Sequence, residues 1–155
     1  MTWAADVHPR LVAIVEGTST TINSHGLPDA FMHVPTVDED SVGSSRSFAI
    51  QTSGGSTPGP HNHVGGRRAT ADVQLVVFYR ELYNRDELNQ IMIADYEQLS
   101  AALLVTADWQ TTTTGIESIA LHGDRDTILD YEIVDTEDRG AMLIIEFPLV
   151  YRRTP

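Results

Sequence analysis

The chain contains no cysteine and no lysine, and it carries little positive charge of any kind. Without cysteine it has no disulfide framework, no thiolate zinc site and no cysteine nucleophile. Its ten basic residues are all arginines and face 22 acidic residues, which gives a formal net charge of −12 at pH 7. A surface this acidic disfavours electrostatic binding to nucleic acids or to an anionic membrane.

Long apolar runs are also missing, as is the pattern of an export signal. No stretch reaches the roughly 18 apolar residues that a membrane-spanning helix needs, and residues 1–10 lack a basic region followed by an apolar one. The sequence therefore predicts a chain that is neither exported nor inserted in a membrane. With 155 residues, 41% of them hydrophobic, we expect a single domain over residues 1–155.

Two segments have the apolar spacing of helices. In residues 6–17 apolar side chains recur three and four positions apart, and Asp6 is placed to cap the helix. Residues 85–105 show the same period over a longer stretch, with apolar side chains at Leu88, Ile91, Met92, Tyr96, Leu99 and Leu103. Asn84 and Glu87 have the spacing of a capping box at its start. The sequence thus predicts one short N-terminal helix and one long central helix.

Other segments alternate between apolar and polar residues or are bounded by turn signals, as strands are. Strands are expected at residues 30–34, 47–51, 70–80, 116–122, 127–134 and 141–152. The last two form a hairpin, and Pro148 indicates an edge or a bulge because proline has no N–H to donate. The expected fold class is α+β, a mainly antiparallel sheet with both helices packed on one face. Met142, Ile144 and Val150 make the other face partly apolar, so we expect a neighbouring subunit to cover it.

Residues 52–68 are rich in glycine and proline and have almost nothing to bury, which predicts a flexible loop or arm. Such loops often serve as contact surfaces. We therefore take the charged and titratable side chains of this segment, together with the two arginines after the last strand's apolar run, as candidates for a partner interface. They are His61, His63, Arg67, Arg68, Arg152 and Arg153.

Two histidines of this loop invite other interpretations. The one-letter codes of His61, Asn62 and His63 spell the name of a nuclease family. In that family, however, the signature residues are spread over a ββα-metal unit many tens of residues long. His61 and His63 with His25 or His33 make three possible metal ligands, yet flexible loops do not supply fixed ligand geometry. We expect no metal and no cofactor.

No enzyme signature is present. The carboxylates of residues 124–126 and 137–139 are close in sequence, but general acid–base catalysis needs an apolar pocket that shifts a pKa, and these segments are predicted as polar turns. The threonine run at residues 111–114 is predicted as a connector. The chain has no Walker-type loop, nucleophile elbow or dinucleotide fingerprint, so we expect no catalytic residues.

Taken together, the order of elements resembles the tail terminator, or tail-completion, proteins of long-tailed bacteriophages. The resemblance rests on three features. They are a short N-terminal helix entered through Val7–Leu11, a strand and long helix from Val73 to about Leu104, and the closing strand in Gly140–Arg153. The similarity spans most of the chain apart from residues 36–68, and it is one of architecture and size.

The resemblance implies a structural virion protein that forms a ring, usually a hexamer, on the last ring of tail-tube subunits. Such a ring stops tube growth, offers a surface to the head–neck connector proteins and lets genomic DNA pass through its lumen without specific binding. It assembles in the host cytoplasm and resides at the tail–neck junction. A tail-to-head joining or neck protein of similar fold is an open alternative, as is a stand-alone small-molecule-binding or enzymatic α+β domain. A tail-tube protein ranks lower, because no sheet-extending hairpin arm is evident.

Overall fold

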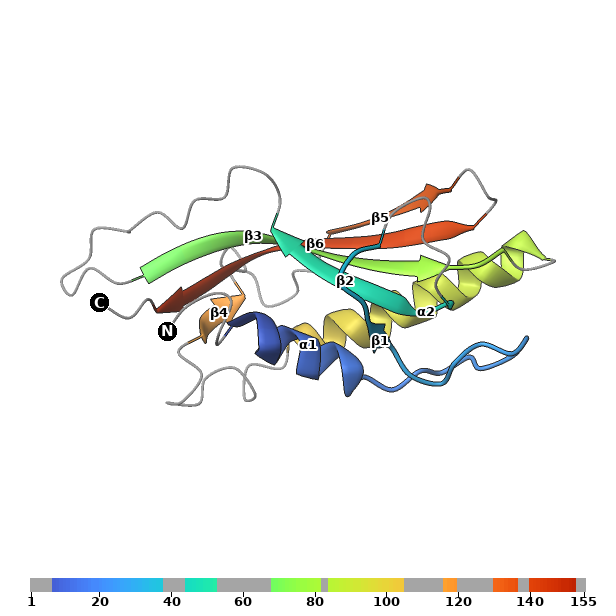
Figure 1. The fold of residues 1–155 in the computed structure, drawn as a ribbon, viewed down its shortest axis with the longest axis horizontal. Coiled ribbons are helices and arrows are strands. Elements are labelled where there is room, and N and C mark those ends of the chain that lie inside the picture. Colours follow the sequence, from blue (N-terminus) through green and yellow to red (C-terminus); the bar gives the residue numbers. More distant parts are fainter. Residues whose placement is uncertain are drawn as a thin grey trace.

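The computed structural model describes residues 7–37, 44–52, 68–81, 84–104, 116–119, 130–136 and 140–152. Within these ranges the chain forms two helices and six strands, labelled in Figure 1. In chain order they are α1 (His8–Glu16), β1 (Met32–His33), β2 (Ser47–Thr52), β3 (Arg68–Tyr79), α2 (Arg85–Leu104), β4 (Ile116–Ile119), β5 (Asp130–Asp135) and β6 (Ala141–Arg152). The fold class is α+β, as the sequence predicts.

A long two-stranded ribbon forms the middle of the sheet. β3 and β6 pair antiparallel along their full length, from Arg68 opposite Arg152 to Tyr79 opposite Ala141. β2 pairs with β3 only over residues 73–78, so the ribbon extends past β2 at its Arg68 end (Figure 1). β1 pairs parallel with β2, and the other side of β6 is shared by β5 and β4. All pairings except that of β1 with β2 are antiparallel.

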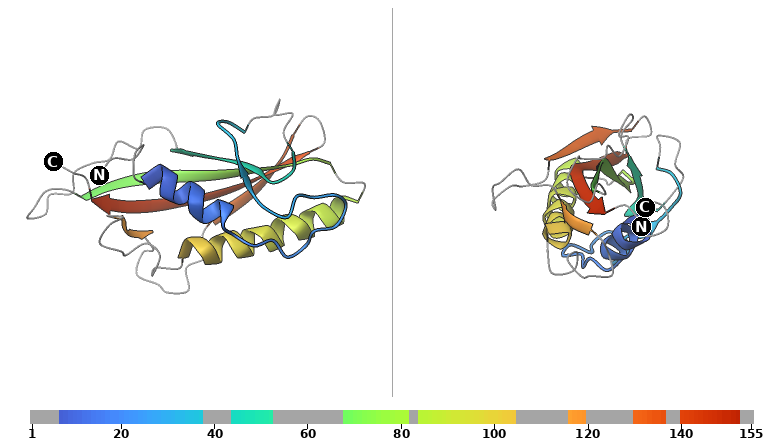
Figure 2. Two further views of the ribbon diagram at one scale, coloured as in Figure 1. Left: turned by 60° about the horizontal axis from the view of Figure 1, so that its bottom comes forward. Right: turned by 90° about the vertical axis from the view of Figure 1, so that its left-hand side faces the viewer.

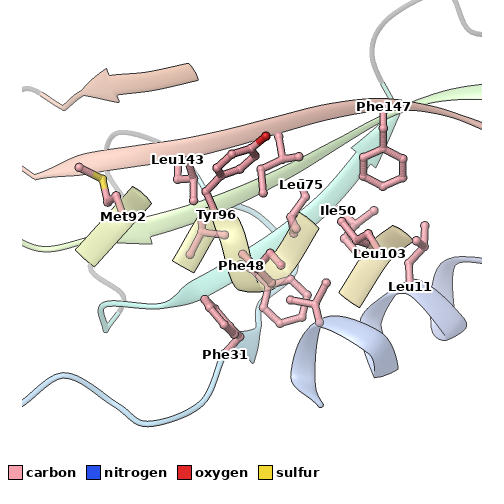
Figure 3. Packing of buried hydrophobic residues seen from close by; sticks show 14 of the residues in the cluster. Leu11, Phe31, Phe48, Ile50, Leu75, Met92, Tyr96, Leu103, Leu143 and Phe147 are labelled. Carbon is pink, nitrogen blue, oxygen red and sulfur yellow. The ribbon is translucent and has the colours of Figure 1, made fainter. Parts of the chain in front are cut away.

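Both helices lie on the same face of this sheet (Figure 2). Alternate residues of β3 and β6 point to the helices and form the main core with them (Figure 3). All six apolar positions predicted on the stripe of α2 are buried: Leu88, Ile91, Met92, Tyr96, Leu99 and Leu103. On the predicted N-terminal stripe, Leu11 and Val15 of α1 and the preceding Val7 are buried, whereas Ile14 is half-buried. The apolar face of each helix, which repeats every 3.6 residues, therefore packs against the apolar face of the sheet, which repeats every two residues.

The opposite face of the sheet, which we call the outer face, differs from expectation at its centre. Ala49, Val76 and Phe78 are buried there, although they do not belong to the main core cluster. These three positions are therefore covered within the chain itself. Met142 and Ile144 are half-buried.

The start of α1 departs from the prediction. The helix begins at His8 with Val7 as its N-cap, and Val7 forms no side-chain capping hydrogen bond. Asp6, the predicted cap, lies outside the described residues. Pro9 in the first turn explains why a side-chain cap matters less here. Proline has no N–H, and one of the unsatisfied donors of the first turn is therefore absent.

At the start of α2 the predicted capping box forms only in half. Asn84 Oδ1 accepts a hydrogen bond from the Asp86 backbone N–H at 3.0 Å, so Asn84 caps the helix. Glu87 does not complete the box with its side chain toward Asn84. Its carboxylate pairs with His25, 2.7 Å away across the surface.

The strand boundaries agree with the prediction best where the strands are long. β6 covers residues 141–152, as predicted, whereas β1 is reduced to two residues. Thr52 ends β2 and Arg68 begins β3, so both end residues of the predicted 52–68 arm belong to strands, and residues 53–67 lie outside the described part. The turn and connector predictions at residues 111–114, 124–126 and 137–139 also lie outside it.

Pro148 lies neither on an edge strand nor at a bulge of its own strand, because β6 is paired on both sides. β5 pairs with residues 141–146 of β6, and β4 pairs with residues 149–151. Pro148 falls between these two partners, and the register irregularity is in β4, between Ile116 and Ser118. An interior proline is tolerated here because neither β4 nor β5 pairs with its position.

Candidate functional site

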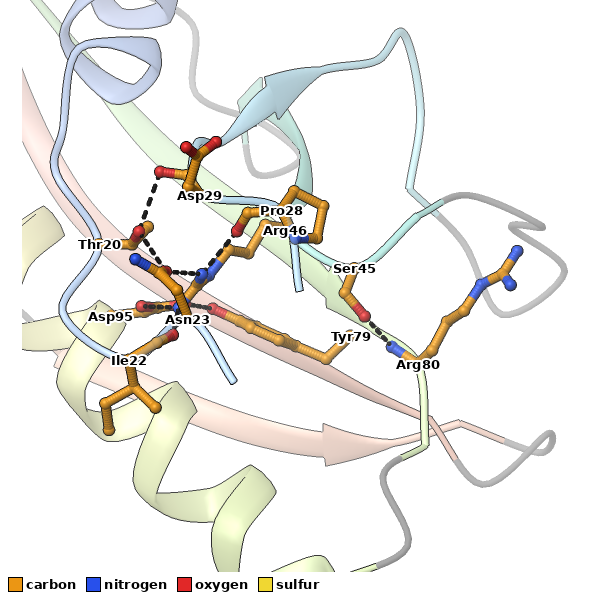
Figure 4. A network of polar contacts seen from close by, with 10 residues as sticks. All are labelled: Thr20, Ile22, Asn23, Pro28, Asp29, Ser45, Arg46, Tyr79, Arg80 and Asp95. Atoms are coloured by element: carbon orange, nitrogen blue, oxygen red, sulfur yellow. Dashed lines mark hydrogen bonds and ion pairs between the residues drawn. The ribbon is translucent and has the colours of Figure 1, made fainter. Parts of the chain in front are cut away.

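The side chain of Arg46, which precedes β2, is fully buried although it is charged. Arg46 and Asp95 of α2 are both fully buried and form a two-pronged ion pair, with Nε 2.9 Å from Oδ2 and Nη2 2.9 Å from Oδ1. The Tyr79 hydroxyl, from the end of β3, donates to Asp95 Oδ2 at 2.7 Å (Figure 4). A guanidinium and a carboxylate with parallel bonds form the strongest type of ion pair in proteins.

The remaining donors of the guanidinium bind the segment 17–31, which connects α1 to β1. Nη1 donates to Asn23 Oδ1 at 2.7 Å and to the Pro28 carbonyl at 2.6 Å, and Nη2 donates to the Ile22 carbonyl at 2.7 Å. Together with the two bonds to Asp95, these account for all five N–H donors of Arg46. The segment is thereby joined to both α2 and the sheet.

The backbone of Arg46 is held as firmly as its side chain. Its φ of 66° lies in the left-handed region, which costs a non-glycine residue about 1–3 kcal/mol. Its N–H donates to the Phe78 carbonyl at 2.7 Å, and its carbonyl accepts from the Met32 N–H at 3.0 Å. Arg46 therefore links β1, β3 and α2 at one point, and we call Arg46, Asp95, Tyr79 and Asn23 the buried network.

The buried network has the chemistry of a structural support. Asp95 accepts three hydrogen bonds from Arg46 and Tyr79, which occupy both carboxylate oxygens. Burial raises the pKa of the Tyr79 phenol well above 10, and the nearby Asp95 charge adds to the rise. The Tyr79 phenol therefore stays protonated at neutral pH.

Replacing Tyr79 with phenylalanine tests this network by its dependence on pH. At pH 7 we expect the free energy of unfolding to fall by about 1.5–3 kcal/mol, because Asp95 loses one donor. Above pH 10 the unfolded chain ionises this tyrosine while the folded chain does not, so wild-type stability falls with rising pH. The variant lacks that loss.

The gap between wild type and Tyr79→Phe should therefore narrow as the pH rises above 10. Urea unfolding at pH 7, 10 and 11 measures this gap directly. A gap that stays constant over that range would show that Tyr79 ionises as freely in the folded chain as in the unfolded one.

Histidines of the described residues take part in packing and in a surface ion pair. The His33 ring lies 5.6 Å from the His8 ring and 5.4 Å from the Phe48 ring, centroid to centroid. Burial lowers the pKa of His8, and the charge of His33 lowers it further. His25 pairs with Glu87, where both side chains are nearly half exposed. His25 and His33 thus have partners other than a shared metal ion.

Within the described ranges, no group of three or more His, Asp or Glu side chains is arranged to hold a metal ion. Across the same residues no helix combines the length and apolar character required to cross a bilayer.

The structure describes the backbone of two of the six predicted interface residues, and the strand register places these two positions side by side. Arg68 begins β3 and Arg152 ends β6, and the register places them directly opposite each other at the end of the ribbon. We call this pair the arginine end. Arg67 and Arg153 are their neighbours in sequence and, like His61 and His63, lie outside the described residues.

Four exposed carboxylates lie on the outer face of the sheet, and we call them the acidic patch: Asp72, Asp130, Glu132 and Glu146. Glu146 of β6 stands opposite Asp130 of β5 in register. On its other side, Glu146 Oε1 accepts a hydrogen bond of 2.6 Å from Gln74 Nε2. Gln74 Oε1 in turn accepts one of 2.9 Å from Gln51 Nε2, which continues the polar row to β2.

Sequence reasoning overlooks the buried network. Asp95 shares the helical stripe of Ile91 and Leu99, so an acid on an apolar face was a usable signal for a buried partner. Nothing in the sequence identifies that partner as Arg46, which is 49 positions away. The acidic patch is also invisible in sequence, because it depends on the register of β5, β6 and β3.

A comparison with protein-family models finds no match for this chain, and a comparison with curated proteins finds none either.

Proposed function

We propose that this chain is a structural protein of a long-tailed bacteriophage virion, which caps the tail tube as a hexameric ring. In this role it ends tube growth, contacts the head–neck connector proteins and performs no catalysis. It assembles in the host cytoplasm and lies at the tail–neck junction. The observation that carries the proposal is the resemblance in architecture to tail terminator proteins.

The three elements on which that resemblance rests all form as ordered structure. They are α1 at the N-terminal side, β3 followed by the 20-residue α2, and the 12-residue closing strand β6. β3 and β6, which are more than 60 positions apart in sequence, form the central ribbon of the sheet. The proposal rests on this combination of two helices with a long central ribbon.

The chemistry of the described residues also supports a structural role. Their most buried ion pair is saturated with hydrogen bonds inside the chain and joins elements to one another. The formal charge of −12 on each copy suits a ring through which DNA passes, because repulsion between like charges opposes adhesion of DNA to the lumen.

The proposal is tested with polymerising tail-tube protein from the same phage. Adding the purified chain is expected to shorten the tubes and to place one extra ring on a single tube end, seen by negative-stain microscopy. A chain that leaves tube length unchanged but binds the head–neck connector would favour the tail-to-head joining role. A chain that binds neither would contradict the proposal and favour a stand-alone domain.

A further inference from the structure

Two histidines meet where the first helix packs against the edge of the sheet. His8 is the first residue of α1, and His33 belongs to β1, which pairs with β2. Their rings lie edge to face, with 5.6 Å between the centroids. Both side chains are half-buried, so water screens a charge on either ring less than it does at an exposed site. A proton on one ring therefore acts strongly on the other.

The surroundings of His8 favour the neutral imidazole. Burial and the charge of His33 lower the pKa of His8, and a hydrogen bond with the Ile50 backbone opposes this only in part. His8 also lies at the N-terminal end of α1, where the positive end of the helix dipole disfavours a cation. The first turn of α1 contains no acidic residue that could offset this effect.

The strands that pack against the two rings bring no carboxylate to them. β1 contributes His33 itself, and β2 contributes the Phe48 ring, 5.4 Å from His33, and the Ile50 backbone. On α1 the charged residues are Arg10, a cation, and Glu16. Glu16 is eight residues further along the helix than the first histidine, about 12 Å at 1.5 Å per residue. This exceeds the screening length of about 8 Å at physiological ionic strength.

The long helix also packs against α1, but its acids do not act on the histidine pair. The four carboxylates of α2 do not shift the pKa of His8. Two of them have cationic partners elsewhere, because Asp95 pairs with Arg46 and Glu87 pairs with His25.

From this geometry we infer that the contact of His8 with His33 is a pH-sensitive switch, which keeps α1 packed on the sheet at neutral pH and releases its N-terminal end below about pH 6. When both rings carry a proton, they repel each other across the boundary between α1 and β1. The other end of α1 stays attached, because Arg46 binds the Ile22 and Pro28 carbonyls of the segment that follows the helix. Release exposes the apolar side of α1, which consists of Val7, Leu11 and Val15.

Proton binding gives the direction of the change with pH. A histidine in a released or unfolded segment has a pKa near 6.5, whereas His8 in the packed helix has a lower pKa. Below pH 6.5 the released state therefore binds more protons than the packed state, and the packed state loses stability as the pH falls. Carboxylates stay ionised down to pH 5.5, because their usual pKa is about 4.

Hydrogen–deuterium exchange of the α1 amides at pH 7.5 and 5.5, corrected for the intrinsic exchange rate, tests the switch. At the lower pH we expect the protection of α1 to fall at least about threefold more than that of α2. His8→Gln and His33→Gln each remove one of the two charges and should keep α1 equally protected at both pH values. His33→Arg introduces a permanent charge and should lower the protection of α1 already at pH 7.5.

The matched control is His25→Gln, because His25 pairs with Glu87 of α2 on the surface. This variant should respond to pH as the wild type does. The chain has six histidines, and comparison of the variants with this control assigns the response to His8 and His33. Circular dichroism verifies that each variant folds, and if His33→Arg does not, the two glutamine variants still decide the question.

The inference is overturned if the protection of α1 relative to α2 is the same at both pH values in the wild type. It is also overturned if the glutamine variants lose protection as the wild type does, or if His25→Gln abolishes the response. A response that is lost in both glutamine variants and kept in the control supports it. Because the exchange is measured on the free chain, none of these results depends on whether the chain caps a tail tube.

Discussion

Replacing Asp95 with alanine is expected to lower the free energy of unfolding by about 3–5 kcal/mol, the cost of leaving a buried charge without its counter-ion. The fully buried Arg46 guanidinium would lose two of its five hydrogen bonds, and the Tyr79 hydroxyl would lose its acceptor. Water does not readily replace these lost hydrogen bonds, because both side chains of the ion pair are fully buried. Chemical denaturation monitored by circular dichroism measures the loss.

The matched control for this change is Glu97→Ala, two positions along the same helix on its exposed side. That substitution should change the free energy of unfolding by no more than about 0.5 kcal/mol, as is usual for the surface. If Asp95→Ala costs no more than the control, the buried network is not the support that its geometry indicates.

Replacing Leu143 with alanine should produce the second large effect, a loss of about 2–5 kcal/mol in the free energy of unfolding. Leu143 is fully buried in β6, opposite Val77 of β3 and Ile133 of β5, on the face that the helices cover. Removing its side chain leaves a cavity in the main core. Thermal and urea denaturation of the variant measure the cost.

Ile144, the next residue, provides the comparison. It points to the outer face and is only half-buried, so Ile144→Ala should cost clearly less than Leu143→Ala. Equal losses at the two positions would contradict a single core between helices and sheet, and would indicate that the outer face is packed to a similar density.

The helices and long strands could be predicted because their apolar period is repeated several times. Each of the six apolar positions predicted on the buried stripe of α2 is buried, and the limits of β6 agree with the prediction to the residue. The predicted strand boundaries are wrong where the local sequence pattern is short, as at β1. β1 spans only two residues. Its position beside β2 depends on a tertiary contact, in which the Met32 N–H donates to the Arg46 carbonyl.

The candidate site could be predicted only in part, for a physical reason. That Arg68 and Arg152 are interface candidates follows from their place beside a glycine-rich segment and after a strand. That they lie opposite each other follows from the register of two strands more than 60 positions apart, and no local sequence pattern encodes this register. The pairing of Arg46 with Asp95 is likewise a tertiary contact, and the other four predicted interface residues lie outside the described part of the chain.

The central claim is that this chain is a ring-forming structural protein, and its mass in solution tests that claim most directly. Light scattering over a concentration series, with negative-stain images of the same sample, gives both the number of subunits and the shape. The account predicts a closed ring of about six copies with an open centre, formed either free in solution or on tube ends. A stable monomer that ignores tube ends at every concentration would contradict it.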